Sequence, residues 1–99
     1  MTNIPEAKPT TLTPHLTVRN AVEALEFYEK AFGAQILCAL KSPDGKLMHG
    51  AVSIDGATFY VVDEYPEMGG TSPQALNGSP VTLHLQVADC DAVYNRAVE

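Results

Sequence analysis

The sequence predicts an α+β fold built from supersecondary modules that each begin with a strand and continue into a helix. The phrase His15-Leu16-Thr17-Val18 recurs as His84-Leu85-Gln86-Val87, 69 residues later (84 − 15). The first copy leads into a helix and three strand candidates, and the second leads into the start of another helix. This spacing exceeds the roughly 20–50-residue period of solenoid repeats, so it indicates a duplicated module.

The first module is predicted over residues 15–64, after a polar, proline-containing lead over residues 1–14. Polar and apolar residues alternate through residues 15–18, as is typical of a half-buried strand. Asn20, followed three residues later by Glu23, resembles a capping box and predicts the start of a helix. We expect this helix to carry an apolar stripe and to end near Gly33.

Three strands are predicted to follow the helix, over residues 36–40, 47–54 and 58–62. Ser42-Pro43-Asp44-Gly45 predicts a turn, because its glycine stands where a positive φ is favoured. Asp55-Gly56 is a strong signal for a two-residue hairpin. The expected order of this module is therefore strand, helix and three strands.

Residues 65–80 are rich in glycine and proline, which predicts a loop between modules. A new strand is expected over residues 82–87, and Asp89 or Asp91 is expected to cap a further helix. Residues 81–99 are therefore predicted to be the start of a second module, with its strand and helix only. We expect a fragment of a longer protein; a partner chain that supplies the missing strands and a degenerate half are the alternatives.

Composition and charge exclude several classes of function. The net charge of −6 and the pI near 4.8 argue against a surface for nucleic acid or an anionic membrane. No apolar run reaches the roughly 18 residues of a membrane span, and no signal peptide is recognisable. Cys38 and Cys90 lack closely spaced partners, which excludes a zinc finger or CxxC motif. We therefore expect a cytoplasmic protein that binds neither nucleic acid nor membrane.

The three histidines are expected on the less apolar face of the sheet, away from the helix. Strand periodicity assigns to this face His15, Thr17, His49, Ser53, His84 and Gln86. Imidazole suits Zn, Fe, Ni or Mn, and two histidines with one carboxylate leave coordination positions open for water or substrate. The same side chains are equally compatible with ordinary polar strand residues.

The sequence resembles the vicinal oxygen chelate superfamily, in particular PhnB-like members of its glyoxalase/bleomycin resistance/dioxygenase group. The resemblance covers residues 12–99. It is carried by Pro14-His15-Leu16-Thr17-Val18, Glu26-Phe27-Tyr28-Glu29-Lys30-Ala31-Phe32-Gly33-Ala34, Asp44-Gly45-Lys46-Leu47-Met48-His49 and Val87-Ala88-Asp89-Cys90-Asp91-Ala92. It implies paired βαβββ modules (glyoxalase/bleomycin resistance/dihydroxybiphenyl dioxygenase-like) around a shared cavity, of which the second is incomplete in this chain.

The resemblance also implies a site. His15 and His84 match the ligands that the two modules supply to a divalent metal, which would be Zn, Fe, Ni or Mn. Tyr60 stands near the remaining ligand position of the first module and is not a carboxylate. The expected cavity-lining residues are Thr17, His49, Ser53, Tyr60 and Gln86. Asp63 and Glu64 are interpreted as solvated loop acids.

Two functions are compatible with this resemblance. The first is a small-molecule-binding, metal-dependent enzyme of the lyase or isomerase, dioxygenase or transferase class. The alternative is a non-catalytic protein that sequesters a drug or metabolite, for which the acidic net charge would favour a cation. A homodimer is expected in either case, because exposed sheet edges favour pairing.

Overall fold

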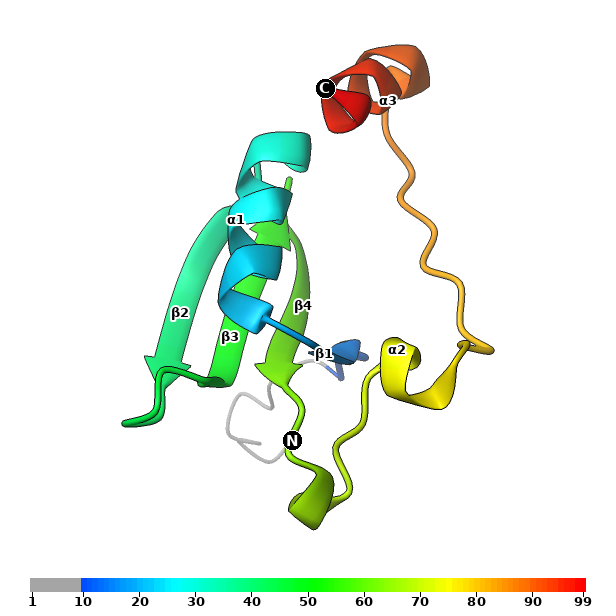
Figure 1. Cartoon of the computed structure of the whole chain (residues 1–99). Coiled ribbons are helices and arrows are strands. Elements are labelled where there is room, and N and C mark those ends of the chain that lie inside the picture. The colour runs from blue at the N-terminus through cyan, green and yellow to red at the C-terminus, as the bar shows by residue number, and fades with distance from the viewer. Residues whose placement is uncertain (1–9) are drawn as a thin grey trace, which may run out of the picture.

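The computed structural model describes residues 10–99, so most of the predicted lead lies outside the described part. The fold is α+β, as predicted (Figure 1). A helix and four strands form its core: β1 (His15–Val18), α1 (Ala21–Phe32), β2 (Gln35–Lys41), β3 (Leu47–Ile54) and β4 (Ala57–Asp63). Three short helical elements follow: η1 (Pro66–Met68), α2 (Pro73–Leu76) and α3 (Cys90–Val98).

The four strands form one mixed sheet in the order β1-β4-β3-β2. β1 runs parallel to β4, whereas β3 is antiparallel to both β4 and β2. The hairpin between β3 and β4 turns at Asp55 and Gly56, whose φ angles are 50° and 87°. Two consecutive positive φ angles are the requirement of the favoured two-residue hairpin turn, which confirms the prediction from Asp-Gly.

Helix α1 covers one face of the sheet, and among residues 10–99 no helix covers the opposite face, which we call the open face (Figure 1). The core lies between α1 and the sheet, and its buried members are Ala21, Leu25, Ala34, Leu47, Val52 and Val61. The helix ends as predicted at Gly33, which has a φ of 65° and donates its N–H to Glu29 O at 3.0 Å. This packing fixes which side of each strand stays outside the core.

The start of α1 differs from the prediction. Asn20 adopts a left-handed conformation and its side chain makes no capping hydrogen bond, so the capping-box interpretation is wrong. Asp63 replaces it: its carboxylate accepts from Ala21 N at 3.0 Å and from Leu47 N at 2.7 Å. The parallel register places Asp63 beside Val18, close to the start of the helix, where a carboxylate also interacts favourably with the helix dipole.

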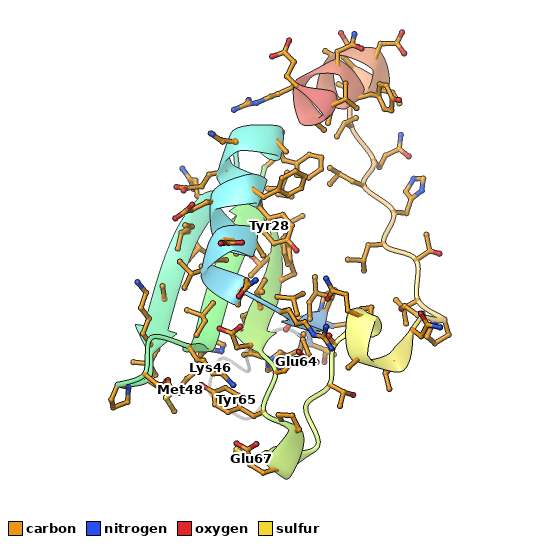
Figure 2. All side chains as sticks on the ribbon, in the orientation of Figure 1. Tyr28, Lys46, Met48, Glu64, Tyr65 and Glu67 are labelled. Carbon is orange, nitrogen blue, oxygen red and sulfur yellow. The ribbon has the colours of Figure 1, made fainter. Side chains whose placement is uncertain are left out.

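Glu64 is not a solvated loop acid either. Its carboxylate accepts from Arg19 Nε at 2.7 Å and from the backbone N–H and hydroxyl of Ser72 at 3.0 and 2.8 Å. The hydrogen bonds from Ser72 and then from Arg19 lower the pKa of Glu64 to about 2. Figure 2 shows Lys46 in the same corner, where Nζ bonds Glu64 O at 3.1 Å and lies 5.0 Å from the ring centroid of Tyr65. These contacts anchor the chain after β4.

Of the two elements predicted over residues 81–99, the helix forms and the strand does not. Asp89 caps α3 as expected, accepting from Ala92 N at 3.0 Å. The strand expected over residues 82–87 is absent: this segment runs from α2 to α3 beside the core without a hydrogen-bonded neighbour among residues 10–99 (Figure 1). A strand needs a second strand to satisfy its backbone groups, which the described residues do not supply.

The remaining elements are held by local contacts. The region expected to be a loop contains η1 and α2, and α2 is capped by Ser72, whose hydroxyl accepts from Ala75 N. Helix α3 packs beside the end of α1, where Arg96 Nε donates to Lys30 O at 2.9 Å. No helix within residues 10–99 has the length and apolar character needed to cross a membrane.

Candidate functional site

The open face of the sheet brings together residues from all four strands. The register pairs Tyr60 with His15 on one side and with Ala51 on the other, and pairs Ala51 with Cys38. Because paired residues of neighbouring strands point to the same face, these four side chains form a row across the sheet. His49 belongs to the same face, two residues before Ala51 on β3.

Three rings of this face meet edge to face. The centroids of His49 and Tyr60 are 4.8 Å apart, those of His15 and Tyr60 5.9 Å, and those of the two histidines 6.3 Å. The planes are inclined by 60–87°, the arrangement that aromatic rings favour. We call His15, His49 and Tyr60 the ring cluster. Its three members come from three adjacent strands, so the sheet sets their spacing.

The ring cluster is accessible. His15 is exposed, and His49 and Tyr60 are half-buried. Ala51 stands in the same row as Tyr60 and is 8% exposed, so the neighbouring side chains cover it. The described residues contain no hydrogen bond that engages these imidazoles or this phenol. Their polar atoms are therefore available to a ligand that approaches this face.

Two other predicted cavity residues have different surroundings. Ser53 is on the open face but is 8% exposed, and its hydroxyl accepts from Gly56 N at 3.1 Å, which stabilises the hairpin turn. Thr17 is half-buried on β1, two residues beyond His15. Ser53 is thus engaged in the turn, whereas Thr17 stays near the ring cluster.

The structure does not bring His84 to the ring cluster. His84 lies on the unpaired segment, where its Nε2 is 3.2 Å from Gln86 Oε1. It borders a hollow of about 360 Å³ together with Tyr28, Phe32 and Phe59. Tyr28 and Phe59 pack against the core between α1 and the sheet. His84 and Gln86 are therefore associated with the helix-covered side.

The resemblance implies a metal held by both His15 and His84. In the structure His15 belongs to the open face, and His84 borders the hollow beside Tyr28 and Phe59. Residues 10–99 contain no group of three or more His, Cys, Asp or Glu side chains placed to hold a metal ion. The metal site with His15 and His84 as ligands stays a prediction.

The hollow beside His84 is mostly apolar, and burial raises the pKa of Tyr28 within it. Sequence reasoning did not identify this hollow, because it depends on the path of the segment after α2. It also did not place Cys38 on the open face. A register shift in β2 between Ile36 and Cys38 sets that position, and local alternation gives no signal for such a shift.

Comparison with known proteins gives relatives without assigned functions. No family model matches the chain. Uncharacterised proteins of Mycobacterium bovis and Mycobacterium tuberculosis are each 49% identical to it over 90 residues, which is 88% of this chain. The match covers 59% of the first protein and 53% of the second. The chain thus spans little more than half the length of the curated relatives it matches.

Two solved structures share the fold. A gene product from Arabidopsis thaliana superimposes with a TM-score of 0.69 and 28% identity, over 92% of this chain and 72% of the other. A PhnB protein from Bacillus cereus, provisionally named a 3-demethylubiquinone-9 3-methyltransferase, superimposes with a TM-score of 0.52 and 23% identity. That match covers 57% of this chain and 50% of the other. The fold is therefore similar to that of a PhnB protein, and the comparison gives no activity.

Proposed function

We propose that this protein binds a small, flat molecule on the open face of its sheet, within a PhnB-like fold of the vicinal oxygen chelate type. The observation that carries the proposal is the ring cluster. Three rings from three strands meet at centroid distances of 4.8–6.3 Å on a face that α1 leaves open. Binding sites are commonly made of aromatic side chains with a few polar atoms that orient the ligand, and both are present here.

A planar aromatic cation suits this face best. Each aromatic pair adds about 0.5–1.5 kcal/mol beyond the area it buries, and a cation over a tyrosine face adds about 0.5–2 kcal/mol. The net charge of −6 raises the local concentration of cations around the chain. The predicted activity is therefore sequestration of a cationic aromatic compound.

We propose that the open face is closed into a cavity by a second βαβββ module paired with the first. The free edge of β1 faces residues 78–81 and Leu83 across a hollow of about 610 Å³. The Cα radius of gyration is 16.1 Å, against about 13 Å for a compact domain of 100 residues. We propose that residues 15–64 form one module, that residues 65–80 connect it to a second, and that residues 81–99 start the second. Strands of the whole protein or of a second copy would then close the face into a cavity.

The metal-dependent enzyme is the weaker candidate. It needs one metal bound by both His15 and His84, of which the first stands in the ring cluster and the second borders the hollow beside Tyr28. Sequestration needs only the ring cluster. The geometry of the described residues therefore favours the binding protein.

The test is a fluorescence titration with berberine, a planar aromatic cation whose emission rises when it leaves water. The metal-free protein is expected to bind it, and Tyr60→Ala is expected to weaken binding about tenfold, because one ring contact of about 1.4 kcal/mol is lost. His84→Ala is the matched control and is expected to bind like the parent protein. Equal affinities of the parent and Tyr60→Ala would overturn the proposal, as would loss of all binding when metal is removed.

The proposed pairing has its own measurement. Exposed edges at β1 and β2 predict a homodimer, since each of these strands has a single neighbour in the sheet that residues 10–99 form. Light scattering at micromolar concentration is expected to give twice the mass of the chain. A monomer at that concentration would contradict the homodimer and leave the ligand-binding test unaffected.

A further inference from the structure

We propose that the hollow between α1 and residues 83–85 is a second binding site, which takes a small, uncharged, largely apolar molecule that carries one hydrogen-bond acceptor. The hollow lies on the helix-covered side of the sheet, and no member of the ring cluster lines it. The site is therefore separate from the binding surface on the open face, and either of the two can fail without the other.

The inner walls of the hollow are apolar and are built on the core. Tyr28 and Phe32 stand one helical turn apart on α1 and border the hollow together. Leu16 on β1 and Phe59 on β4 share the face of the sheet toward the helix, because the register pairs Leu16 with Val61, two residues beyond Phe59. A helix and two adjacent strands thus hold these four side chains in place.

The outer wall is the unpaired segment. Leu83 and Leu85 border the hollow from this side and are both exposed. The packing of the described residues leaves about 360 Å³ between the segment and the core, within the range of about 300–1,000 Å³ that is usual for small-molecule sites. An apolar molecule in this space would bury apolar surface on both of its sides, which favours binding.

Tyr28 supplies a hydrogen-bond donor to the hollow. Figure 2 shows this residue on the side of α1 that faces the unpaired segment. Phe59 holds its ring edge to face, with the centroids 5.4 Å apart and the planes inclined by 80°. Burial raises the pKa of the phenol, so the hydroxyl keeps its proton at neutral pH, and within residues 10–99 no hydrogen bond engages it. A carbonyl or ether oxygen of a ligand would accept this proton.

The charge of the surroundings selects an uncharged ligand. Among the described residues, those that line the hollow include no Asp, Glu, Lys or Arg. A charged molecule would lose its water there without gaining a charged partner, which is unfavourable. The net charge of −6 also disfavours anions such as fatty acids. A neutral aryl ketone combines the required apolar ring with a single acceptor.

The experiment is a fluorescence titration with prodan, a neutral naphthyl ketone whose emission moves to shorter wavelength in apolar surroundings. The parent protein is expected to bind one molecule per chain with such a shift. Ala57→Trp adds an indole at an exposed position that borders the hollow, and is expected to weaken binding at least about tenfold. Ala39→Trp, at an exposed position on β2 that does not border the hollow, is the matched control and is expected to stay within about twofold of the parent.

Tyr28→Phe tests the donor separately. It keeps the ring and removes the hydroxyl, so it is expected to weaken prodan binding about fivefold. Thermal melting of each variant verifies that the fold is kept. If Ala57→Trp were to unfold, Tyr28→Phe would replace it, and parent-like binding by Tyr28→Phe would then overturn the proposal.

The outcomes distinguish the hollow from other places of binding. Parent-like binding by Ala57→Trp would overturn the proposal, and so would equal losses in Ala57→Trp and Ala39→Trp. An affinity that falls as the protein concentration rises would show that a second copy occupies the hollow, which also overturns it.

Tyr60→Ala separates the two proposed sites. This variant is expected to bind berberine less tightly and prodan unchanged. Loss of prodan binding in Tyr60→Ala would place prodan on the open face and overturn the second site alone. Unchanged berberine binding in Tyr60→Ala, with prodan binding still sensitive to Ala57→Trp, would overturn the proposed function alone.

Discussion

Asp63 is the residue on which the first module depends most, and its replacement by asparagine gives a quantitative test. The carboxylate accepts two backbone N–H groups, from Ala21 at 3.0 Å and from Leu47 at 2.7 Å, and the residue is 8% exposed. Asparagine preserves one acceptor oxygen but directs an amide group at the other N–H. One buried donor then loses its partner, and the remaining bond loses its charge.

The expected cost follows from these two bonds. A hydrogen bond to a charged group contributes about 1.5–3 kcal/mol, so Asp63→Asn is expected to lower the free energy of unfolding by about 2–3 kcal/mol. For a domain of this size that loss lowers Tm by roughly 10–20 °C. It is also a large share of the about 5–15 kcal/mol that stabilises a typical domain.

Urea unfolding followed by circular dichroism measures this loss. Asp55→Asn is the matched control, because Asp55 is exposed in the hairpin turn at a φ of 50°, which asparagine also tolerates. Its free energy of unfolding is expected to change by less than about 0.5 kcal/mol. If the two variants were to unfold at the same urea concentration, the role assigned to Asp63 would be refuted.

The remaining predictions concern the contacts that hold the chain after β4 and the end of α1. The folded pKa of Glu64 is lowered from its ordinary 4.5 to about 2, so its stabilising effect is complete above about pH 4.5 and is lost as the pH falls toward 2. Glu64→Gln should therefore lower Tm at pH 7 and approach the parent near pH 2, whereas Glu67→Gln, on an exposed residue, should melt like the parent at both pH values. A Tm difference for Glu64→Gln that does not depend on pH would contradict this. Gly33→Ala is expected to cost about 1 kcal/mol of backbone strain and also to crowd Arg96, since a Cβ there would lie 3.1 Å from Arg96 Nη1. Gly45→Ala shares the strain but has open space around it, so hydrogen exchange in α3 should rise for the Gly33 variant only. Arg96→Ala removes the bond to Lys30 O and should raise exchange in α3 in the same way; unchanged exchange would show that this bond does not hold α3.

The strands, helix α1 and the tight turns could be predicted because their signals are local. Alternation with a period of two is a property of an extended backbone, so it predicts His15 and His49 on one face without reference to strand pairing, and the register agrees. Asp55-Gly56 and Gly33 adopt the positive φ angles that their positions suggested. The three rings of the ring cluster come together because β4 lies between β1 and β3 in the sheet, and local alternation does not predict this strand order.

The predictions that failed concern residues whose structure depends on partners that are distant in the sequence. Asp63 caps a helix that starts 42 residues earlier in the chain, so Asn20 with Glu23 gave a local pattern that the fold does not use. Glu64 becomes fixed because Arg19 and Ser72 come together around it. Residues 82–87 have the composition of a strand but no neighbour with which to pair in the described chain. Composition sets strand preference, whereas pairing decides whether a strand forms.

The central claim is that the open face carrying the ring cluster is the binding surface. Its most direct measurement is a carbon-detected NMR map of the histidine and tyrosine rings during titration with berberine. The ring signals of His15, His49 and Tyr60 are expected to shift together and to saturate at one affinity, while those of His84 stay in place. Shifts confined to His84 and Tyr28 would place the ligand in the hollow beside α1 and contradict the account.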